Sequence, residues 1–434
     1  MPESYKKVLI ITYYWPPAAG AGVFRVLKFV KYLPHFGWKP VILTVKNGAF
    51  PARDPSLTTE VPDICRVYTS RNFEPANLYK KVVGMDQEDR IPSAVLTQEN
   101  LSWRKKLTHW IRLNLFLPDA KIGWIPFGVH RGRQIIAAEQ PDLIFSTSPP
   151  PTTHLVGKFL KGISGLPWVA DFRDPWTNVY YYDQLPRSPI SQKIDRSLEK
   201  SVVQRCDKTV VVNNGFFDYD SAGIHPVRIP NGFDRDDIPE LPESVNNRKF
   251  TLRYFGTMKS RQYVESLFDV LKDLGETEKY RDSIRVEIIG PVESEALEKI
   301  RKKNIALELQ FTGYMNHPEG LQRIAEADLL VFVIGKSSQA EVILSSKIFE
   351  YLMVRRPILG IGPPEGDASE LLLRTGAGKM FDYRDQSGIR TFCINQFEKW
   401  EDGEVEVSID TDEIEKYSRY SLTKKLTKVF EELA

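Results

Sequence analysis

The sequence has few of the residues that build metal centres and disulfide frameworks. Its three cysteines, Cys65, Cys206 and Cys393, lie far apart in the chain. They are too few for a disulfide framework or a cysteine-rich zinc site. The six histidines are dispersed, and neither an H-x-x-H nor an H-E-x-x-H spacing occurs. These residues therefore predict no bound metal.

The sequence also lacks a charge excess and long apolar runs. A formal net charge of +2 gives no global field that would attract nucleic acid. No uninterrupted apolar segment approaches the length needed to span a bilayer. The first apolar run, "KVLIIT" at 7–12, is too short for a signal peptide and predicts a strand. We therefore expect a reduced, cytoplasmic protein that does not bind nucleic acid.

Short β-rich runs alternate with segments of helical periodicity along most of the 434 residues. This pattern predicts parallel sheets with helical crossovers, in an α/β chain of two doubly wound domains facing across a cleft. The Pro-, Asp- and Asn-rich segment 230–248 is the expected linker. Residues 46–118 fit the alternation poorly and are interpreted as a long insertion after the second strand.

The stretch "YYWPPAAGAGVFR", residues 13–25, follows the first strand and contains an incomplete dinucleotide fingerprint. Arg25 replaces the third glycine, and the second predicted strand ends at Lys46 instead of an acidic residue, so NAD binding is not expected. Gly20 and Gly22 would still let backbone N–H groups approach an anion at a helix N-terminus. Arg25 could add a bidentate charge for phosphate. The alternative is a surface arginine above a turn whose glycines serve packing.

A second candidate is the helix predicted after "SS" in "ILSSKIFEYLMVRRPIL". Lys347 falls in its first turn, where a cation opposes the helix dipole unless an anion is bound there. Glu350 follows three residues later on the same face. The pair would suit a diphosphate and its neighbouring ribose, with the carboxylate accepting from the diol. A plain surface ion pair is the alternative.

Two further strand ends carry charged residues. The run "WVADF" leads into Asp171, Arg173 and Asp174, which form either a functional cluster or an internal clamp that holds the loop. The run "YFGTMKSR" places Gly256, Lys259 and Arg261 at a strand-to-helix turn, as a second phosphate site.

These four stretches, in this order, resemble the retaining, family 4-type nucleotide-sugar glycosyltransferases of the GT-B fold. "PPAAGAGVFR" is similar to the glycine loop of their first domain, and "PNGFD" (230–234) to their interdomain motif. "YFGTMKSR" is similar to the phosphate turn of their second domain, and "SSKIFEYLMVRRPIL" to their ribose-binding helix, with Glu350 in the ribose-binding place. "LPDAKIGWIPFG" and "ADFRDPW" resemble the branch that builds bacterial surface polysaccharides.

The resemblance implies an acceptor-side domain at 1–232, a nucleotide-sugar domain at 233–408, and a last helix within 409–434 that crosses back to the first domain. It also implies transfer of a sugar from a nucleoside diphosphate to an acceptor hydroxyl, with retention and without a metal or other cofactor. Gly20, Gly22, Arg25, Gly256, Lys259, Arg261, Lys347 and Glu350 would bind the donor. Asp171, Arg173 and Asp174 would position the acceptor or the transferred sugar.

Three positions depart from the family pattern. The first glutamate of its Glu-x7-Glu helix motif is Val342 here, with Glu341 one place away. Arg173–Asp174 stands where many members have His-Asp, and Gln262 where a lysine is common. A sugar-nucleotide epimerase of the same fold and a non-catalytic nucleotide-sugar-binding module therefore remain alternatives.

Residues 101–117, "LSWRKKLTHWIRLNLFL", combine helical periodicity of apolar residues with several cations. A basic amphipathic helix with tryptophans suits a membrane interface, which would present a lipid-linked acceptor to the first domain. The alternative is that the same apolar stripe packs on that domain's core. The residues concerned are Trp103, Leu107, Trp110, Ile111 and Leu115, with Arg104, Lys105, Lys106 and Arg112.

Overall fold

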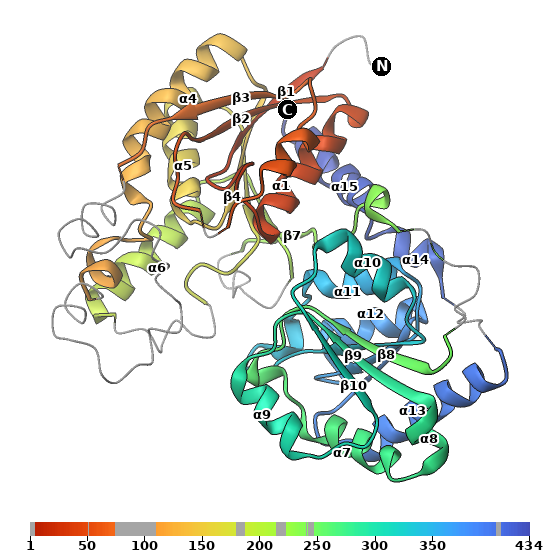
Figure 1. Ribbon diagram of the computed structural model, residues 1–434. Helices are drawn as coiled ribbons and strands as arrows, with labels where there is room; N and C mark the ends of the chain where they lie inside the picture. The colour runs from red at the N-terminus through yellow and green to blue at the C-terminus, as the bar shows by residue number, and fades with distance from the viewer. Residues whose placement is uncertain are drawn as a thin grey trace. The chain divides into compact units, whose positions relative to one another are not determined.

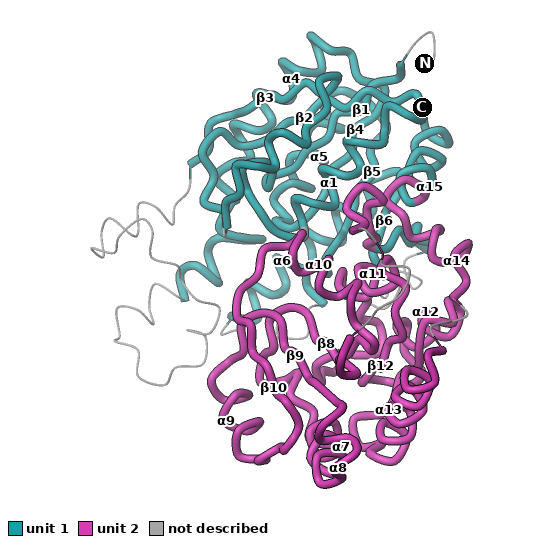
Figure 2. Tube along the Cα trace, turned by 45° about the vertical axis from the view of Figure 1, so that its right-hand side comes forward, with its two compact units in different colours: residues 1–230, 422–434 teal, residues 231–421 magenta. Residues whose placement is uncertain are grey.

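The computed structural model describes residues 5–50, 52–73, 110–178, 187–213, 223–239, 241, 247–404 and 409–434. The chain divides into two compact units (Figure 2). Unit 1 comprises residues 1–230 and 422–434, and unit 2 comprises residues 231–421. The boundaries predicted from the sequence lie after residues 232 and 408.

Unit 1 is built on a seven-stranded sheet in the order β3-β2-β1-β4-β5-β6-β7, in which every paired strand is parallel to its neighbour (Figure 1). The strands are β1 (Lys6–Ile11), β2 (Trp38–Val45), β3 (Arg66–Ser70), β4 (Leu143–Ser148), β5 (Trp168–Phe172), β6 (Lys208–Val211) and β7 (Val227–Arg228). Its helices include α1 (Ala21–Tyr32), α4 (Ile125–Glu139), α5 (Thr152–Ser164), α6 (Pro189–Val203) and α15 (Arg419–Glu431).

Helix α1 begins directly after the opening turn, at Gly20, and one face of it is apolar. Val23, Val26, Leu27 and Val30 repeat at helical spacing and are buried in one of the two cores of unit 1. Gly37, with a φ of 77°, ends the short 3₁₀ turn Leu33–Phe36 that follows α1. The helix therefore holds the opening turn firmly against the sheet.

The segment 46–118 is only partly an insertion, which corrects the sequence prediction. Its residues Arg66–Ser70 form β3, which pairs with β2 at the edge of the sheet. Strand β3 is half exposed and polar on one face, so its sequence lacks the continuous apolar run of the other strands. It is held by Glu139 of α4, whose Oε1 accepts from Tyr68 Oη at 2.5 Å and from Arg66 Nη1 at 2.7 Å.

Unit 2 has a six-stranded parallel sheet in the order β10-β9-β8-β11-β12-β13. The strands are β8 (Phe250–Phe255), β9 (Ile284–Ile289), β10 (Glu308–Gly313), β11 (Leu329–Val333), β12 (Ile358–Ile361) and β13 (Gly378–Phe381). The helices are α7 (Glu265–Gly275), α8 (Glu278–Ser283), α9 (Ser294–Lys302), α10 (His317–Ala325), α11 (Ser346–Met353), α12 (Asp367–Thr375), α13 (Gln386–Glu401) and α14 (Thr411–Glu415).

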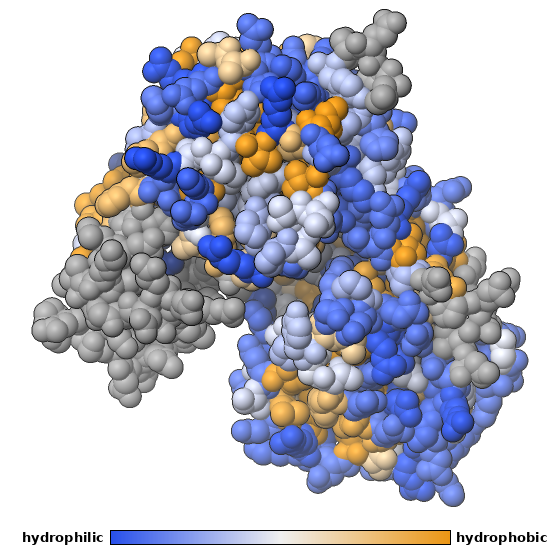
Figure 3. Space-filling view, turned by 45° about the horizontal axis from the view of Figure 1, so that its top comes forward, coloured by the Kyte–Doolittle hydropathy of each residue, from blue (hydrophilic) through white to orange (hydrophobic). Residues whose placement is uncertain are grey.

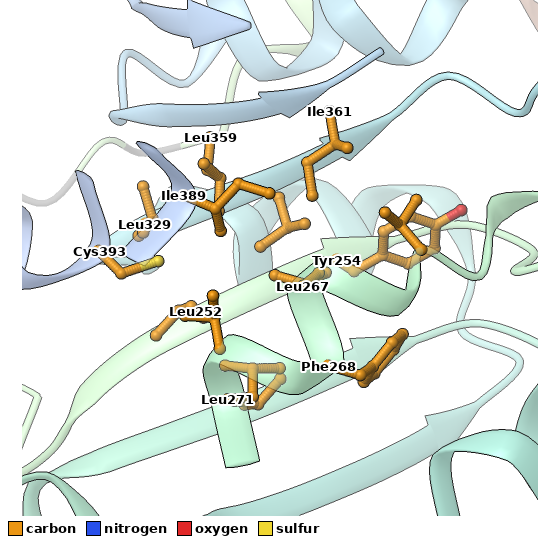
Figure 4. Packing of buried hydrophobic residues seen from close by; sticks show 14 of the residues in the cluster. Leu252, Tyr254, Leu267, Phe268, Leu271, Leu329, Leu359, Ile361, Ile389 and Cys393 are labelled. Atoms are coloured by element: carbon orange, nitrogen blue, oxygen red, sulfur yellow. The ribbon is translucent and has the colours of Figure 1, made fainter. Parts of the chain in front are cut away.

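Figure 4 shows one core of this unit, where side chains of β8, β11 and β12 meet those of α7 and α13. Leu252, Leu267 and Leu359 are among the residues packed there. Both sheets have the doubly wound order, and the predicted α/β fold class is confirmed.

Helix α15 belongs mainly to unit 1, although the chain reaches it only after completing unit 2. Leu422, Leu426, Val429 and Phe430 are buried in the same core as α1. The ring of Phe430 lies 5.2 Å from that of Trp38 on β2 and contacts Phe145 on β4. The resemblance described above predicts that the last helix crosses back to the first domain.

Candidate functional site

In each sheet the strand order reverses at one point: between β1 and β4 in unit 1, and between β8 and β11 in unit 2. Open parallel sheets bind ligands beyond the carboxyl ends of their strands at this switch point. In unit 2, Gly256 follows β8 directly, and α11 lies between β11 and β12 in the chain. The predicted residues Gly256, Lys347 and Glu350 therefore come from the segments that meet there.

The Lys347 side chain lies against the backbone of Gly256. A Cβ added at Gly256 would sit 3.1 Å from Lys347 Nζ and 3.0 Å from its Cε, and the φ of 107° at this position favours glycine. The ammonium also lies over the ring of Tyr254, at 4.1 Å from its centroid. Lys347 is therefore directed to the turn after β8 and is not a plain surface residue.

Burial changes the acid–base behaviour of this lysine. Removal from water lowers the pKa of Lys347 to about 8, and the charge of Glu350 opposes that shift only in part. An anion bound at this turn would favour the charged form of the partly buried lysine.

Helix α11 is fixed at the switch point by Tyr351. The backbone N–H of Phe255 donates to Tyr351 Oη at 2.8 Å, and that hydroxyl donates to the Val331 carbonyl at 3.3 Å. One side chain thus ties α11 to the end of β8 and to the middle of β11. Because Lys347 lies one turn before Tyr351, these hydrogen bonds also fix the position of Lys347 relative to β8 and β11.

Glu350 lies on the same helix, and its Oε1 is 3.2 Å from His317 Nε2. His317 is the first residue of α10, whose N-cap Asn316 accepts from Glu319 N. His317 is not among the site residues predicted from the sequence, because only the fold brings α10 to α11. The motif "NHPE", an N-cap followed by proline, is the one local sign that a helix begins there.

The other two donor candidates of unit 2 are exposed. The Arg261 side chain crosses Gly335, where an added Cβ would lie 2.9 Å from Arg261 Cγ. Gly335 follows β11, one of the two strands that flank the switch point. The Arg261 side chain therefore lies near the carboxyl end of β11. Lys259 precedes the 3₁₀ turn Ser260–Gln262, and its N–H donates to Gln262 Oε1 at 3.0 Å.

In unit 1, the Arg173 side chain lies against Gly22, in the first turn of α1. A Cβ added at Gly22 would lie 2.3 Å from Arg173 Nη1, so only glycine permits this approach. The guanidinium is mostly buried, and its Nε donates at 3.2 Å to Asp174, whose side chain is 51% exposed. Gly20, with a φ of 119°, caps α1 beside them. The structure thus brings Gly22, Arg173 and Asp174 together.

Arg25 and Asp171 differ from the sequence prediction because they bond to each other. Arg25 Nη2 lies 2.7 Å from Asp171 Oδ1, and both side chains are fully buried. The remaining Arg25 contacts go to the carbonyls of Ile229 and Pro230. Because both side chains are fully buried and paired with each other, we assign them to the support of the proposed site.

Residues 22–237 match the model of the family described as Glycosyltransferase Family 4. No curated protein sequence shows significant similarity to the chain.

Solved structures match over the whole chain, although at low identity. HepE of Anabaena, in complex with UDP-glucose, is 13% identical with a TM-score of 0.60, covering 99% of this chain and 100% of that one. A glycosyltransferase of Rickettsia africae is 13% identical, with a TM-score of 0.58 and coverage of 100% and 99%. The lipopolysaccharide outer core galactosyltransferase WaaB is also 13% identical, with a TM-score of 0.57 and coverage of 98% and 100%. Through residues 22–237 the chain therefore belongs to glycosyltransferase family 4, and its two parallel sheets have the GT-B fold.

Proposed function

We propose that this protein transfers a sugar from a nucleoside diphosphate sugar to an acceptor hydroxyl, with retention at the anomeric carbon. The observation that carries the proposal is the partly buried Lys347 ammonium against the Gly256 turn, one helical turn before Glu350. A diphosphate at the turn would supply the anion that the lysine lacks, and the ribose diol would donate to Glu350. Arg261 and Lys259 would add charge at the outer side of the diphosphate.

In this reaction the bond from the anomeric carbon to the diphosphate oxygen breaks, and the bond to the acceptor oxygen forms as the acceptor proton leaves. Negative charge grows on the leaving diphosphate, so fixed cations stabilise the transition state more than the ground state. Lys347 would supply the main part of that stabilisation. In unit 1, Arg173, Asp174 and the Gly20–Gly22 turn would orient the transferred sugar or the acceptor hydroxyl.

The named neighbours guide the choice of donor and acceptor. HepE is described with UDP-glucose and with UDP and glucose, and WaaB as a lipopolysaccharide galactosyltransferase. We therefore propose a uridine diphosphate sugar as the first donor to test. A saccharide or lipid-linked acceptor of bacterial polysaccharide or glycolipid synthesis is the matching acceptor class.

The test combines binding with product analysis. A panel of UDP-, GDP-, ADP- and dTDP-sugars is screened by thermal shift, because a ligand of the folded state raises the melting temperature. The best donor, labelled in its sugar, is then incubated with extracted lipid-linked saccharides. We expect label in the acceptor with unchanged anomeric configuration. Label only in an epimerised donor, or binding without any conversion, would contradict transfer.

We propose further that the reaction needs no divalent metal. Across the described ranges, no group of three or more His, Cys, Asp and Glu side chains could hold a metal ion. Fixed cations would stabilise the negative charge on the leaving diphosphate, which is the role of the metal ion in metal-dependent transferases. Transfer should keep its rate in an excess of EDTA, and loss of activity that Mg²⁺ or Mn²⁺ restores would contradict this.

We also propose a peripheral contact of unit 1 with the cytoplasmic face of a membrane, through 101–117. Residues 101–109 lie outside the described part of the chain, but Trp110 and Leu115 are exposed within it. Ser188 N donates to Asn114 Oδ1 at 2.6 Å, which places this segment beside α6, where Ile190 and Ile194 are also exposed. Exposed apolar side chains near cations suit a lipid interface.

The face in Figure 3 shows hydrophobic residues mostly in small groups among hydrophilic ones, and within the described residues no helix is both long and apolar enough to cross a bilayer. We expect salt-sensitive binding to anionic vesicles that is lost when Trp103, Arg104, Lys105 and Lys106 are replaced together. Equal partitioning of both proteins would refute the contact.

A further inference from the structure

Unit 1 contains a cavity of about 520 Å³ between the carboxyl end of β2 and one face of β3, which neither the proposed donor site nor the proposed catalytic residues use. Its walls come from the opening loop at Trp15, Pro16 and Pro17, from the end of β2 at Val45, and from β3. A volume of this size accommodates a small organic ligand.

Strand β3 gives the cavity one regular wall. Cys65, Val67 and Thr69 line it, and they alternate along the chain with Arg66 and Tyr68, which bond Glu139 on the other face. The bonds to Glu139 therefore hold β3 with its cavity face in a fixed orientation.

The opposite wall is fixed by backbone hydrogen bonds. Asp54 N donates to the Pro17 carbonyl at 2.8 Å, and Ala19 N donates to the Ala52 carbonyl at 3.0 Å. The loop that leads to Gly20 is thereby fastened to the segment before the 3₁₀ turn Pro55–Glu60. The cavity is built into the fold before any ligand binds.

An aromatic ring on the cavity wall is held in place on several sides. Phe50 meets the rings of Tyr13 and Tyr14 edge-on at centroid distances of 6.4 and 6.3 Å. The Arg53 guanidinium lies 5.2 Å from the same ring. A fixed ring of this kind offers a flat apolar surface at little entropic cost.

The rim is polar and carries both signs of charge. Lys46, Thr58, Asp63 and Thr69 line the cavity and are exposed. From the aromatic wall and the mixed polar rim we infer that this cavity binds a neutral saccharide. A pyranose ring would place its C–H face on Phe50 and its hydroxyl groups at the rim, where ammonium, carboxylate and hydroxyl groups can all bond it.

Other ligands match the lining less well. An anionic group attracted by Lys46 would meet the Asp63 carboxylate, and an acyl chain would leave the rim charges without new partners. The role of the bound saccharide as part of the acceptor rests on the proposed function. Its binding to the cavity does not, because no residue of the nucleotide site takes part.

The test uses the full chain without nucleotide, on an array of neutral oligosaccharides, uronic acid-containing oligosaccharides and immobilised decanoate. Thr58→Arg fills the cavity from the 3₁₀ turn, and Thr69→Arg fills it from β3. Thr59→Arg is the matched control, since Thr59 is the exposed neighbour of Thr58 and does not line the cavity. Amide exchange of the wild-type protein with the best oligosaccharide reports the binding place without any substitution.

We expect wild type and Thr59→Arg to bind the same neutral oligosaccharide, and both filling variants to lose at least ~10-fold in affinity, as for the loss of a well-fitted contact. The oligosaccharide should slow amide exchange within 58–69. The inference is overturned if no neutral oligosaccharide binds, if the acidic probes or decanoate bind better, or if exchange in 58–69 does not change. A thermal shift with UDP-glucose on the same samples tests the nucleotide site separately.

Discussion

Arg25 and Asp171 form a buried bidentate ion pair, with Nε to Oδ2 at 3.0 Å and Nη2 to Oδ1 at 2.7 Å. Thr147 Oγ1 donates to the same carboxylate at 2.8 Å. Arg25 also donates to the carbonyls of Ile229 and Pro230, where the first segment of unit 1 ends. The ion pair therefore links this segment end to α1 and β5. Gly22 shares α1 with Arg25, and Arg173 follows β5 directly, so the ion pair also supports the contact between Gly22 and Arg173.

Arg25→Met should destabilise the protein, because it leaves the Asp171 carboxylate buried without a countercharge. The free energy of unfolding in urea should fall by ~3–5 kcal/mol. The double variant Arg25→Met with Asp171→Leu should recover most of that loss, since no unpaired charge remains. A single variant as stable as wild type would show that the pair contributes nothing.

Arg173→Ala should slow sugar transfer while nucleotide binding stays as in wild type, because Arg173 belongs to unit 1 and the nucleotide site to unit 2. We expect kcat to fall by ~10²-fold, as for other fixed polar groups at reacting centres. Gly22→Ala should have a similar effect, since its methyl group would displace the guanidinium. An equal loss of UDP-sugar affinity in either variant would argue against the assignment.

Donor binding should weaken above pH 8. Burial lowers the pKa of Lys347 to about 8, so the lysine of the free protein is charged below that pH and loses its proton above it. An anionic donor binds the charged form, so the dissociation constant should be constant below pH 8 and rise ~10-fold per pH unit well above it. The titration should stop at pH 9, because a UDP-sugar keeps the charge of both its diphosphate and its uracil ring nearly constant up to that pH. Lys347→Arg should remove the dependence, and a flat wild-type profile up to pH 9 would contradict it.

Much of the fold could be predicted from the sequence because the buried strands of both sheets are continuous apolar runs. Val8–Ile11 and Leu329–Val333 are buried throughout and stand out from the helices between them. Strand β3 could not be found in this way, since its outer face is exposed and Glu139, which holds it, is 71 residues from Tyr68.

The candidate site was predictable where its residues are close in the chain. Lys347 and Glu350 share one helix, and Gly256 lies in a recognisable strand-to-helix turn. Contacts between distant residues were not predictable: nothing local shows that Arg25 pairs with Asp171 or that His317 reaches Glu350. The sequence therefore predicts a ligand for Arg25, whereas in the structure Arg25 pairs with Asp171.

In the proposed reaction, Lys347 binds the diphosphate of the donor and stabilises its charge as it leaves. The most direct measurement is the steady-state rate of sugar transfer by Lys347→Met, compared with Lys272→Met, which removes an exposed lysine from α7 of the same unit. We predict that kcat and kcat/KM of Lys347→Met both fall by ~100-fold or more, while Lys272→Met transfers at the wild-type rate. Wild-type kinetics for Lys347→Met with its correct donor would contradict the account.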